Sequence, residues 1–128
     1  MTHTMNAEPI IDRYLAVWSE PDAEIRRSAI AGLWAQDGVE FVEGVQFRGR
    51  EELEVRIAEA YEAFVGSGRY KVTSAGDASG HDDIATFTIQ LTTVAGEVAW
   101  AARVFIVLGE NGLIRQDYQL TVQPLPAE

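Results

Sequence analysis

Apolar residues recur every three or four positions through the first half of the chain, a spacing that predicts three amphipathic helices. The first helix is predicted over residues 10–18 and the second over residues 25–34. A short β-prone stretch at residues 39–42 follows and ends in a turn. The third helix is predicted between Gly49 and Gly66, because glycine commonly begins or ends a helix.

The second half of the chain has the pattern of β-strands. Between residues 86 and 92, threonine and glutamine alternate with phenylalanine, isoleucine and leucine, which is typical of a strand with one buried face. The predicted strands cover residues 70–77, 83–93, 97–108 and 113–122. Helices followed by strands predict an α+β fold in which three N-terminal helices pack on a mostly antiparallel sheet.

Two glycine-containing loops set the expected register of the last three strands. Val94-Ala95-Gly96 and Glu110-Asn111-Gly112 both suit a three-residue hairpin loop with glycine at the left-handed position. These loops pair Thr93 with Glu97 and Gly109 with Leu113, which places Arg103 opposite both Phe87 and Gln119 and diagonal to Asp117. A two-residue loop at either place would turn one strand over.

Composition narrows the possible functions. The chain has 128 residues, the size of one domain, so a single domain over residues 1–128 with a flexible tail at 123–128 is expected. Twenty acidic residues against ten basic ones give a net charge of -10, which disfavours nucleic-acid binding. There is no cysteine, no apolar run long enough to span a membrane and no secretion-signal pattern at the start, so a cytoplasmic location is expected. Two isolated histidines form no metal motif, and no cofactor motif is present, so neither a metal nor a cofactor is expected.

Four segments spread along most of the chain resemble a known superfamily. They are Ile11-Asp12-Arg13-Tyr14-Leu15-Ala16-Val17-Trp18, Leu33 to Phe41, Phe47 to Leu53, and Glu110-Asn111-Gly112-Leu113-Ile114. Together with the order of elements, they resemble the NTF2-like superfamily, specifically its SnoaL-like branch. The resemblance implies a cone in which a curved sheet wraps the helices around an apolar pocket. Members include steroid isomerases, polyketide cyclases, epoxide hydrolases, dehydratases and binding proteins without catalytic activity.

No catalytic set of these relatives is complete in this chain. Tyr14 matches the helix-one tyrosine of the steroid isomerases, but their base position falls on Val42 and their late-strand acid falls near Arg103. Glu40 shares a strand face with Val42 and would replace the base only after a shift along the strand. The cyclase His–Asp pair falls on Asp117 and Gln119, so a carboxylate is present and the histidine is missing.

The candidate site is a pair formed by Arg103 and Asp117 inside the pocket, with Tyr14 as a proton donor on the opposite wall. Arginine can hold a buried carboxylate ionised while leaving one oxygen free to take a proton. These three residues are the predicted catalytic groups, and the predicted ligand-binding residues are Trp34, Glu40, Val42, Tyr61, Phe87, Ile89, Phe105 and Gln119. Two plainer interpretations stay open, namely that the polar face of residues 115–121 is in solvent, and that the Arg103–Asp117 pair is purely structural.

The predicted function is the binding of a small apolar metabolite, with or without turnover. A cofactor-free isomerase, cyclase or hydrolase that uses the Arg–Asp pair is one possibility. A ligand-binding protein without catalytic activity and a dimerisation module are the alternatives. A homodimer is also expected, because the second sheet face carries apolar residues that the helices cannot cover, namely Trp100, Val104, Ile106, Ile114, Tyr118 and Leu120.

Overall fold

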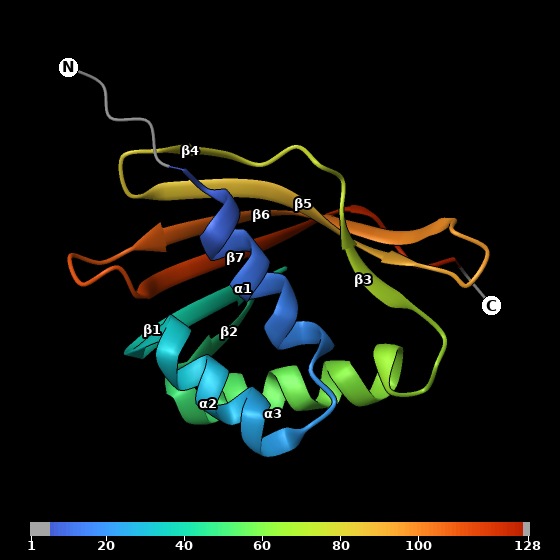
Figure 1. Cartoon of the computed structure of the whole chain (residues 1–128), viewed down its shortest axis with the longest axis horizontal. Coiled ribbons are helices and arrows are strands. Elements are labelled where there is room, and N and C mark those ends of the chain that lie inside the picture. Colours follow the sequence, from blue (N-terminus) through green and yellow to red (C-terminus); the bar gives the residue numbers. More distant parts are fainter. Residues whose placement is uncertain (1–5, 127–128) are drawn as a thin grey trace.

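The computed structural model describes residues 6–126 and confirms an α+β fold with three helices and an open sheet (Figure 1). Its elements are, in chain order, α1 (Glu8–Ser19), α2 (Ala23–Leu33), β1 (Trp34–Val42), β2 (Val45–Arg48), α3 (Gly49–Ala60), η1 (Tyr61–Val65, a π-helical turn), β3 (Lys71–Ser74), β4 (Ser79–His81), β5 (Ile84–Thr92), β6 (Val98–Leu108) and β7 (Ile114–Gln123).

The second helix ends one residue earlier than its apolar spacing predicts. Asp22 caps its start by accepting hydrogen bonds from the backbone amides of Glu24 and Ile25. The helix ends at Leu33, and Trp34 begins β1 instead of closing the helical stripe. An extended Trp34 still buries its ring completely, so the same apolar residue satisfies either pattern.

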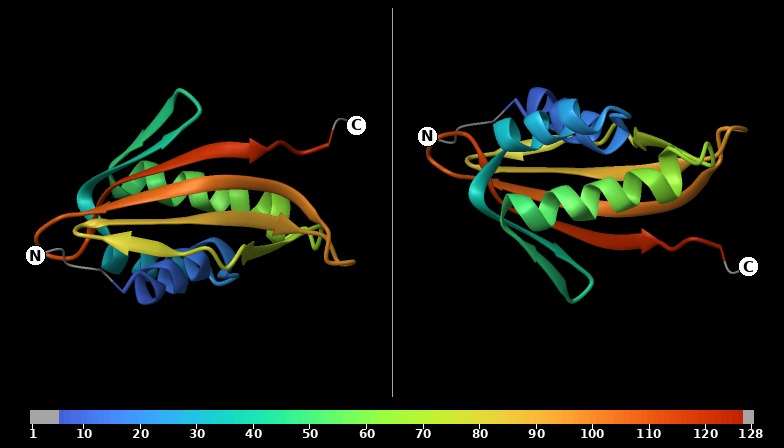
Figure 2. Two further views of the ribbon diagram at one scale, coloured as in Figure 1. Left: turned by 90° about the horizontal axis from the view of Figure 1, so that it is seen from above. Right: turned by 90° about the horizontal axis from the view of Figure 1, so that it is seen from below.

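The sheet has seven strands in the order β2-β1-β7-β6-β5-β3, with β4 paired to β5. All neighbouring strands are antiparallel except β1 and β7, which run parallel. Figure 2 shows the β1–β2 hairpin diverging from the long strands β5–β7, with the helices packed against the sheet. The parallel pairing joins two segments that lie far apart in the sequence, and it brings residues of β1 next to β7.

Both predicted hairpin loops close as expected. The Thr93 amide donates to the Glu97 carbonyl at 2.8 Å, and the Gly109 amide donates to the Leu113 carbonyl at the same distance. Gly96 and Gly112 have φ values of 87° and 77°, the left-handed conformation that glycine adopts without strain.

Two β-bulges overturn the predicted orientation of β6. The β5–β6 register shifts between Leu91 and Thr92, and the β6–β7 register shifts between Val107 and Leu108. Each bulge moves the pairing by one residue, and a one-residue shift turns a strand's side chains to the opposite face. The first shift inverts β6 relative to β5, and the second restores β7 to the face that was predicted.

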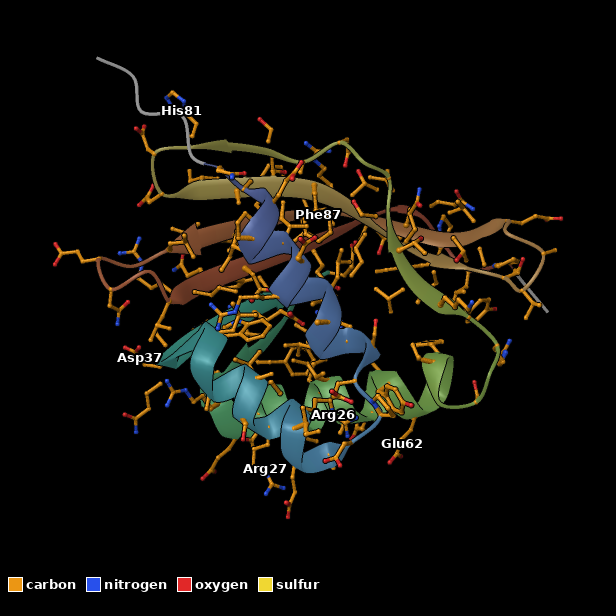
Figure 3. The ribbon with its side chains drawn as sticks, viewed as in Figure 1. Arg26, Arg27, Asp37, Glu62, His81 and Phe87 are labelled. Atoms are coloured by element: carbon orange, nitrogen blue, oxygen red, sulfur yellow. The ribbon has the colours of Figure 1, made fainter. Side chains whose placement is uncertain are left out.

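The inner face of β6 is therefore apolar. Val104 and Ile106 are fully buried there, whereas Arg103 and Phe105 lie on the outer face. Arg103 pairs with Thr88 and Leu120 across the ladders, not with Phe87 and Gln119. Figure 3 shows Phe87 of β5 reaching the layer between the sheet and α1, where it is fully buried.

The C-terminal segment was predicted to be loose from residue 123 onwards. Gln123 instead belongs to β7, and its side chain donates to the Val98 carbonyl at 2.7 Å. Residues 127 and 128 lie outside the described residues. Within residues 6–126, none of the helices is both long and apolar enough to cross a membrane.

The inverted β6 makes a testable pair of predictions. Arg103→Met should change the free energy of unfolding by less than about 1 kcal/mol, because it removes only a partly exposed ion pair with Asp77. Ile106→Ala should cost about 2–5 kcal/mol, because the side chain is fully buried. Urea denaturation measures both, and the reverse ranking would mean that β6 presents Arg103 to the core.

Candidate functional site

A buried carboxylate on β7 is the centre of the candidate site. Asp117 is fully buried, and both of its oxygens accept hydrogen bonds from aromatic side chains. The Tyr14 hydroxyl donates to Oδ2 at 2.8 Å, and the Trp34 indole Nε1 donates to Oδ1 at 2.9 Å. The Gln119 amide Nε2 donates in turn to the Tyr14 oxygen at 2.8 Å. α1, β1 and β7 thus join in one hydrogen-bonded cluster.

The parallel pairing of β1 with β7 adds a second acid to this cluster. Glu40 lies directly across from Asp117 in the ladder and is also fully buried. A register irregularity between Trp34 and Val39 allows β1 to supply both Trp34 and Glu40 to the same region. Gly38 permits the close packing of this irregular stretch, because a Cβ there would lie 3.0 Å from both the Ile114 carbonyl and the Trp34 ring.

Arg56 of α3 provides the positive charge opposite these acids. Its Nε donates to Glu40 Oε1 at 3.0 Å, and its Nη2 donates to Gln119 Oε1 at 3.4 Å. The guanidinium carbon lies 5.2 Å from the ring centres of both Trp18 and Phe47, within the range of a cation–π contact. Arg56 is therefore held by a carboxylate, an amide and two rings.

Burial sets the protonation of Asp117. Removal from water, and then the negative charge of Glu40 and a hydrogen bond with it, raise the pKa of Asp117 well above its ordinary value. Hydrogen bonds from Trp34 and Tyr14 oppose this effect and are outweighed. Burial, followed by the charges of Asp117 and Glu40, also raises the pKa of Tyr14, so that its hydroxyl stays a proton donor.

A cavity of about 240 Å³ opens beside this cluster. Its polar lining residues are Arg56, Gln119 and Thr121, while its apolar lining residues are Trp18, Val42, Ala60, Phe64, Val65, Val72, Ile89, Leu91, Trp100 and Leu125. No acidic or histidine side chain is among these lining residues. The cavity therefore offers hydrogen-bond donors within an apolar wall.

The predicted ligand-binding residues fall into three groups. Val42, Ile89 and Gln119 line the cavity. Trp34, Glu40 and Phe87 are fully buried and do not line it, and the same is true of the predicted catalytic residues Tyr14 and Asp117. Tyr61 and Phe105 lie elsewhere. The Tyr61 ring lies 5.0 Å from the Arg26 guanidinium of α2, which Figure 3 shows directed toward α3, and Phe105 is on the outer sheet face.

The predicted meeting of Arg103 and Asp117 is wrong. Arg103 donates through Nη1 to Asp77 Oδ2 at 2.7 Å and to Thr88 Oγ1 at 3.2 Å, on the outer face of the sheet. The β5–β6 bulge is the physical reason, because it turns this part of β6 over. Asp117 does point inward, and the polar face of β7 at Asp117 and Gln119 is not in solvent.

Arg56, which was not among the predicted site residues, is the arginine of the site in place of Arg103. Its position was available from the helical spacing, since Leu53, Arg56, Ala60 and Phe64 follow one another at intervals of three and four residues. A charged residue within a buried stripe signals a buried partner or a polar cavity. The partner itself was not predictable, because Glu40 reaches the site only through the parallel pairing of β1.

The described residues contain no arrangement typical of a metal centre. Within residues 6–126, no group of three or more histidine, cysteine, aspartate or glutamate side chains gathers in one place. The paired acids at the centre, Glu40 and Asp117, number only two and are already bonded by Arg56, Tyr14 and Trp34.

Comparison with known proteins finds likeness in solved structures alone. No protein-family model and no curated protein matches the chain. A candidate isomerase of the SnoaL-like family from Agrobacterium tumefaciens str. C58 is 25% identical, with 89% of this chain and 95% of that one covered and a TM-score of 0.80. A candidate polyketide cyclase from Sinorhizobium meliloti is 17% identical, with 87% and 93% covered and a TM-score of 0.67.

A third structure, an NTF2-like protein of unknown function from Exiguobacterium sp. 255-15, is 15% identical over 88% of this chain and 97% of its own, with a TM-score of 0.62. At identities of 17% and 15%, the last two structures show a shared fold and nothing about activity.

The raised pKa of Asp117 predicts a stability that falls with rising pH. A group that binds its proton more tightly in the folded state stabilises fully below its unfolded pKa and loses that contribution as pH rises through the folded pKa. We expect Asp117→Asn to remove this slope, which amounts to about 1.4 kcal/mol per pH unit between the two pKa values.

Urea denaturation of the wild type and of Asp117→Asn between about pH 4 and pH 8 measures the difference directly. Glu62→Gln, which changes an exposed carboxylate of η1, is the matched control and should alter stability by less than about 0.5 kcal/mol. A wild type that gains stability relative to Asp117→Asn as pH rises would show that Asp117 is ionised.

Proposed function

Because the chain belongs to the NTF2-like superfamily, in its SnoaL-like branch, we propose that its cavity binds a small apolar molecule that carries a hydrogen-bond acceptor. In this proposal the helices and the curved sheet form a cone whose open end is the ligand site. The volume of about 240 Å³ suits a molecule of one or two rings.

The observation that carries this proposal is the kind of polar atom at the cavity wall. Arg56 uses Nε and Nη2 for protein contacts, and its Nη1 has no hydrogen-bond partner among residues 6–126. Trp18 also lines the cavity, and its buried Nε1 has no hydrogen-bond partner within that part of the chain. The Arg56 guanidinium is a donor at the cavity wall, so a carbonyl or ether oxygen complements it, and the buried Trp18 Nε1 is a second donor without a partner among the described residues.

Matched probes test the preference for an acceptor. We expect 2-acetonaphthone to bind about tenfold more tightly than 2-isopropylnaphthalene, which has a similar shape and no oxygen, because one hydrogen bond to a charged donor is gained. Quenching of tryptophan fluorescence reports binding, since Trp18 and Trp100 line the cavity.

Two α3 variants locate the binding. Ala60→Phe should abolish binding of both probes by filling the cavity, while Val55→Phe, on the exposed side of the same helix, should leave it intact. The combined variant Arg56→Met with Glu40→Gln, which avoids a lone buried charge, should remove the preference for the ketone. Equal affinity for the two probes in the wild type, or binding that survives Ala60→Phe, would contradict the proposal.

Catalysis of proton transfer is the second candidate function. The names of two structural neighbours, a candidate isomerase and a candidate polyketide cyclase, favour it. Within this chain, however, Gln119 lines the cavity and bonds to Tyr14, whereas neither Tyr14 nor Asp117 lines the cavity. A general base must lie within hydrogen-bond reach of the proton that it removes. We therefore expect binding without turnover. If the wild type speeds deuterium exchange at the methyl group of 2-acetonaphthone more than Asp117→Asn does, the protein is instead an enzyme.

We also propose that the protein forms a homodimer through the outer sheet face. Four residues predicted on that face, Trp100, Val104, Ile106 and Ile114, instead lie toward the core. The face keeps an aromatic strip in which the rings of Phe41 and Tyr118 stack at 4.7 Å, and Leu120 nearby is 48% exposed. Covering these apolar groups is the driving force for association.

Light scattering at micromolar concentration tests the dimer. We expect twice the 14.1 kDa mass of one chain, and we expect Leu120→Glu to yield the mass of a single chain. Val55→Glu, on the exposed face of α3, is the control and should leave the mass unchanged. A wild type with the mass of one chain would refute the dimer.

A further inference from the structure

The buried layer next to the cavity contains two acidic side chains and one arginine. Glu40 and Asp117 lie side by side and are fully buried, and Arg56 is the cation that contacts Glu40. Tyr14 is the titratable group that faces them from α1. Two other arginines of the helices bond elsewhere, because Arg50 of α3 donates to the Trp34 carbonyl and Arg26 of α2 donates to the Glu20 carbonyl. β5 and β6 present only apolar side chains here, including Phe87 and Val104.

One proton brings this cluster to neutrality. With both acids ionised, the cluster would carry one uncompensated negative charge away from water, which is costly. As long as Asp117 is ionised, Glu40 Oε2 is buried without a hydrogen-bond donor among residues 6–126. A proton on the neighbouring Asp117 supplies that missing donor. The resting cluster is then an Arg56–Glu40 ion pair beside a neutral carboxyl group.

The resting cluster leaves no charge with which to bind an anion. On the premise that the cavity is the ligand site, we propose that it takes an uncharged acceptor ligand directly and an anionic ligand only together with one proton. An uncharged carbonyl needs only the unpartnered Nη1 group of Arg56.

An anion instead competes with Glu40 for the Arg56 guanidinium. Once Arg56 pairs with the ligand, Glu40 would be a buried negative charge without a cation. A proton from solvent then adds to the Glu40 carboxylate and forms an O–H bond, so that the charge of the cluster with its ligand is again balanced. The overall protein charge of -10 adds a repulsion that favours the neutral ligand further.

Two naphthalene probes separate the proposal from its premise. We expect the affinity for 2-naphthoate to fall about tenfold for each unit between about pH 6 and pH 8, and the affinity for 2-acetonaphthone to stay constant over that range. Calorimetry in phosphate and in Tris, two buffers with different ionisation enthalpies, should show uptake of about one proton for each 2-naphthoate bound.

Two variants assign the proton to Glu40. Asp117→Asn replaces a neutral acid with a neutral amide and should keep the pH dependence of 2-naphthoate binding, because Glu40 is still present. The double variant Asp117→Asn with Glu40→Gln should lose the pH dependence and bind 2-naphthoate more tightly than the single variant at about pH 8, because Arg56 is no longer neutralised. Circular dichroism establishes that both variants fold. The proton uptake of the wild type tests the proton coupling without any variant.

The outcomes are distinct. Failure of both probes to bind would remove the proposed function. Three results would overturn the proton coupling alone, provided that 2-acetonaphthone still binds. They are 2-naphthoate binding that is independent of pH, 2-naphthoate binding that takes up no proton, and no 2-naphthoate binding at about pH 6. A pH dependence that persists in the double variant would overturn the assignment to Glu40.

Discussion

The burial of two carboxyl groups beside one guanidinium is the constraint on which the site depends. Asp117 and Glu40 are neighbours in a parallel strand pair and are fully buried, so each needs either a proton or a cation. Arg56 forms an ion pair with Glu40, while Tyr14 and Trp34 donate hydrogen bonds to Asp117. The cluster links α1, α3, β1 and β7, so the acid pair connects the helices to the sheet. A single proton keeps the arrangement neutral.

This constraint also separates the cavity from the acids. The polar residues of the cavity wall are Arg56, Gln119 and Thr121, and Arg56 bonds to both Glu40 and Gln119. Glu40 and Asp117 do not line the cavity. The acids therefore affect the balance of charge at the cavity wall through Arg56, without lining the cavity themselves. A site of this kind is suited to holding an uncharged oxygen in an apolar setting. In a catalytic centre, by comparison, the acid or base contacts the reacting atoms.

Much of the fold follows from the sequence because it depends on local pattern. Helical spacing, the strand alternation and the two glycine loops predict the order of elements, and the loops close between Thr93 and Glu97 and between Gly109 and Leu113 as expected. The bulges could not be predicted from loop counting. The free-energy cost of burying an unpaired arginine predicts the orientation of β6 better than loop counting does. A strand that is otherwise apolar on both faces turns Arg103 outward.

The site was only partly predictable for the same reason. Asp117, Gln119 and Tyr14 lie together because their strand and helix faces are set by local periodicity. Glu40 and Arg56 join them through the β1–β7 pairing and the packing of α3, which no local pattern specifies. The most direct measurement of the account is the infrared band of a protonated carboxyl group at neutral pH. The account predicts that the wild type shows this band and that Asp117→Asn lacks it. A wild type in which every carboxyl group is ionised at neutral pH would contradict the account.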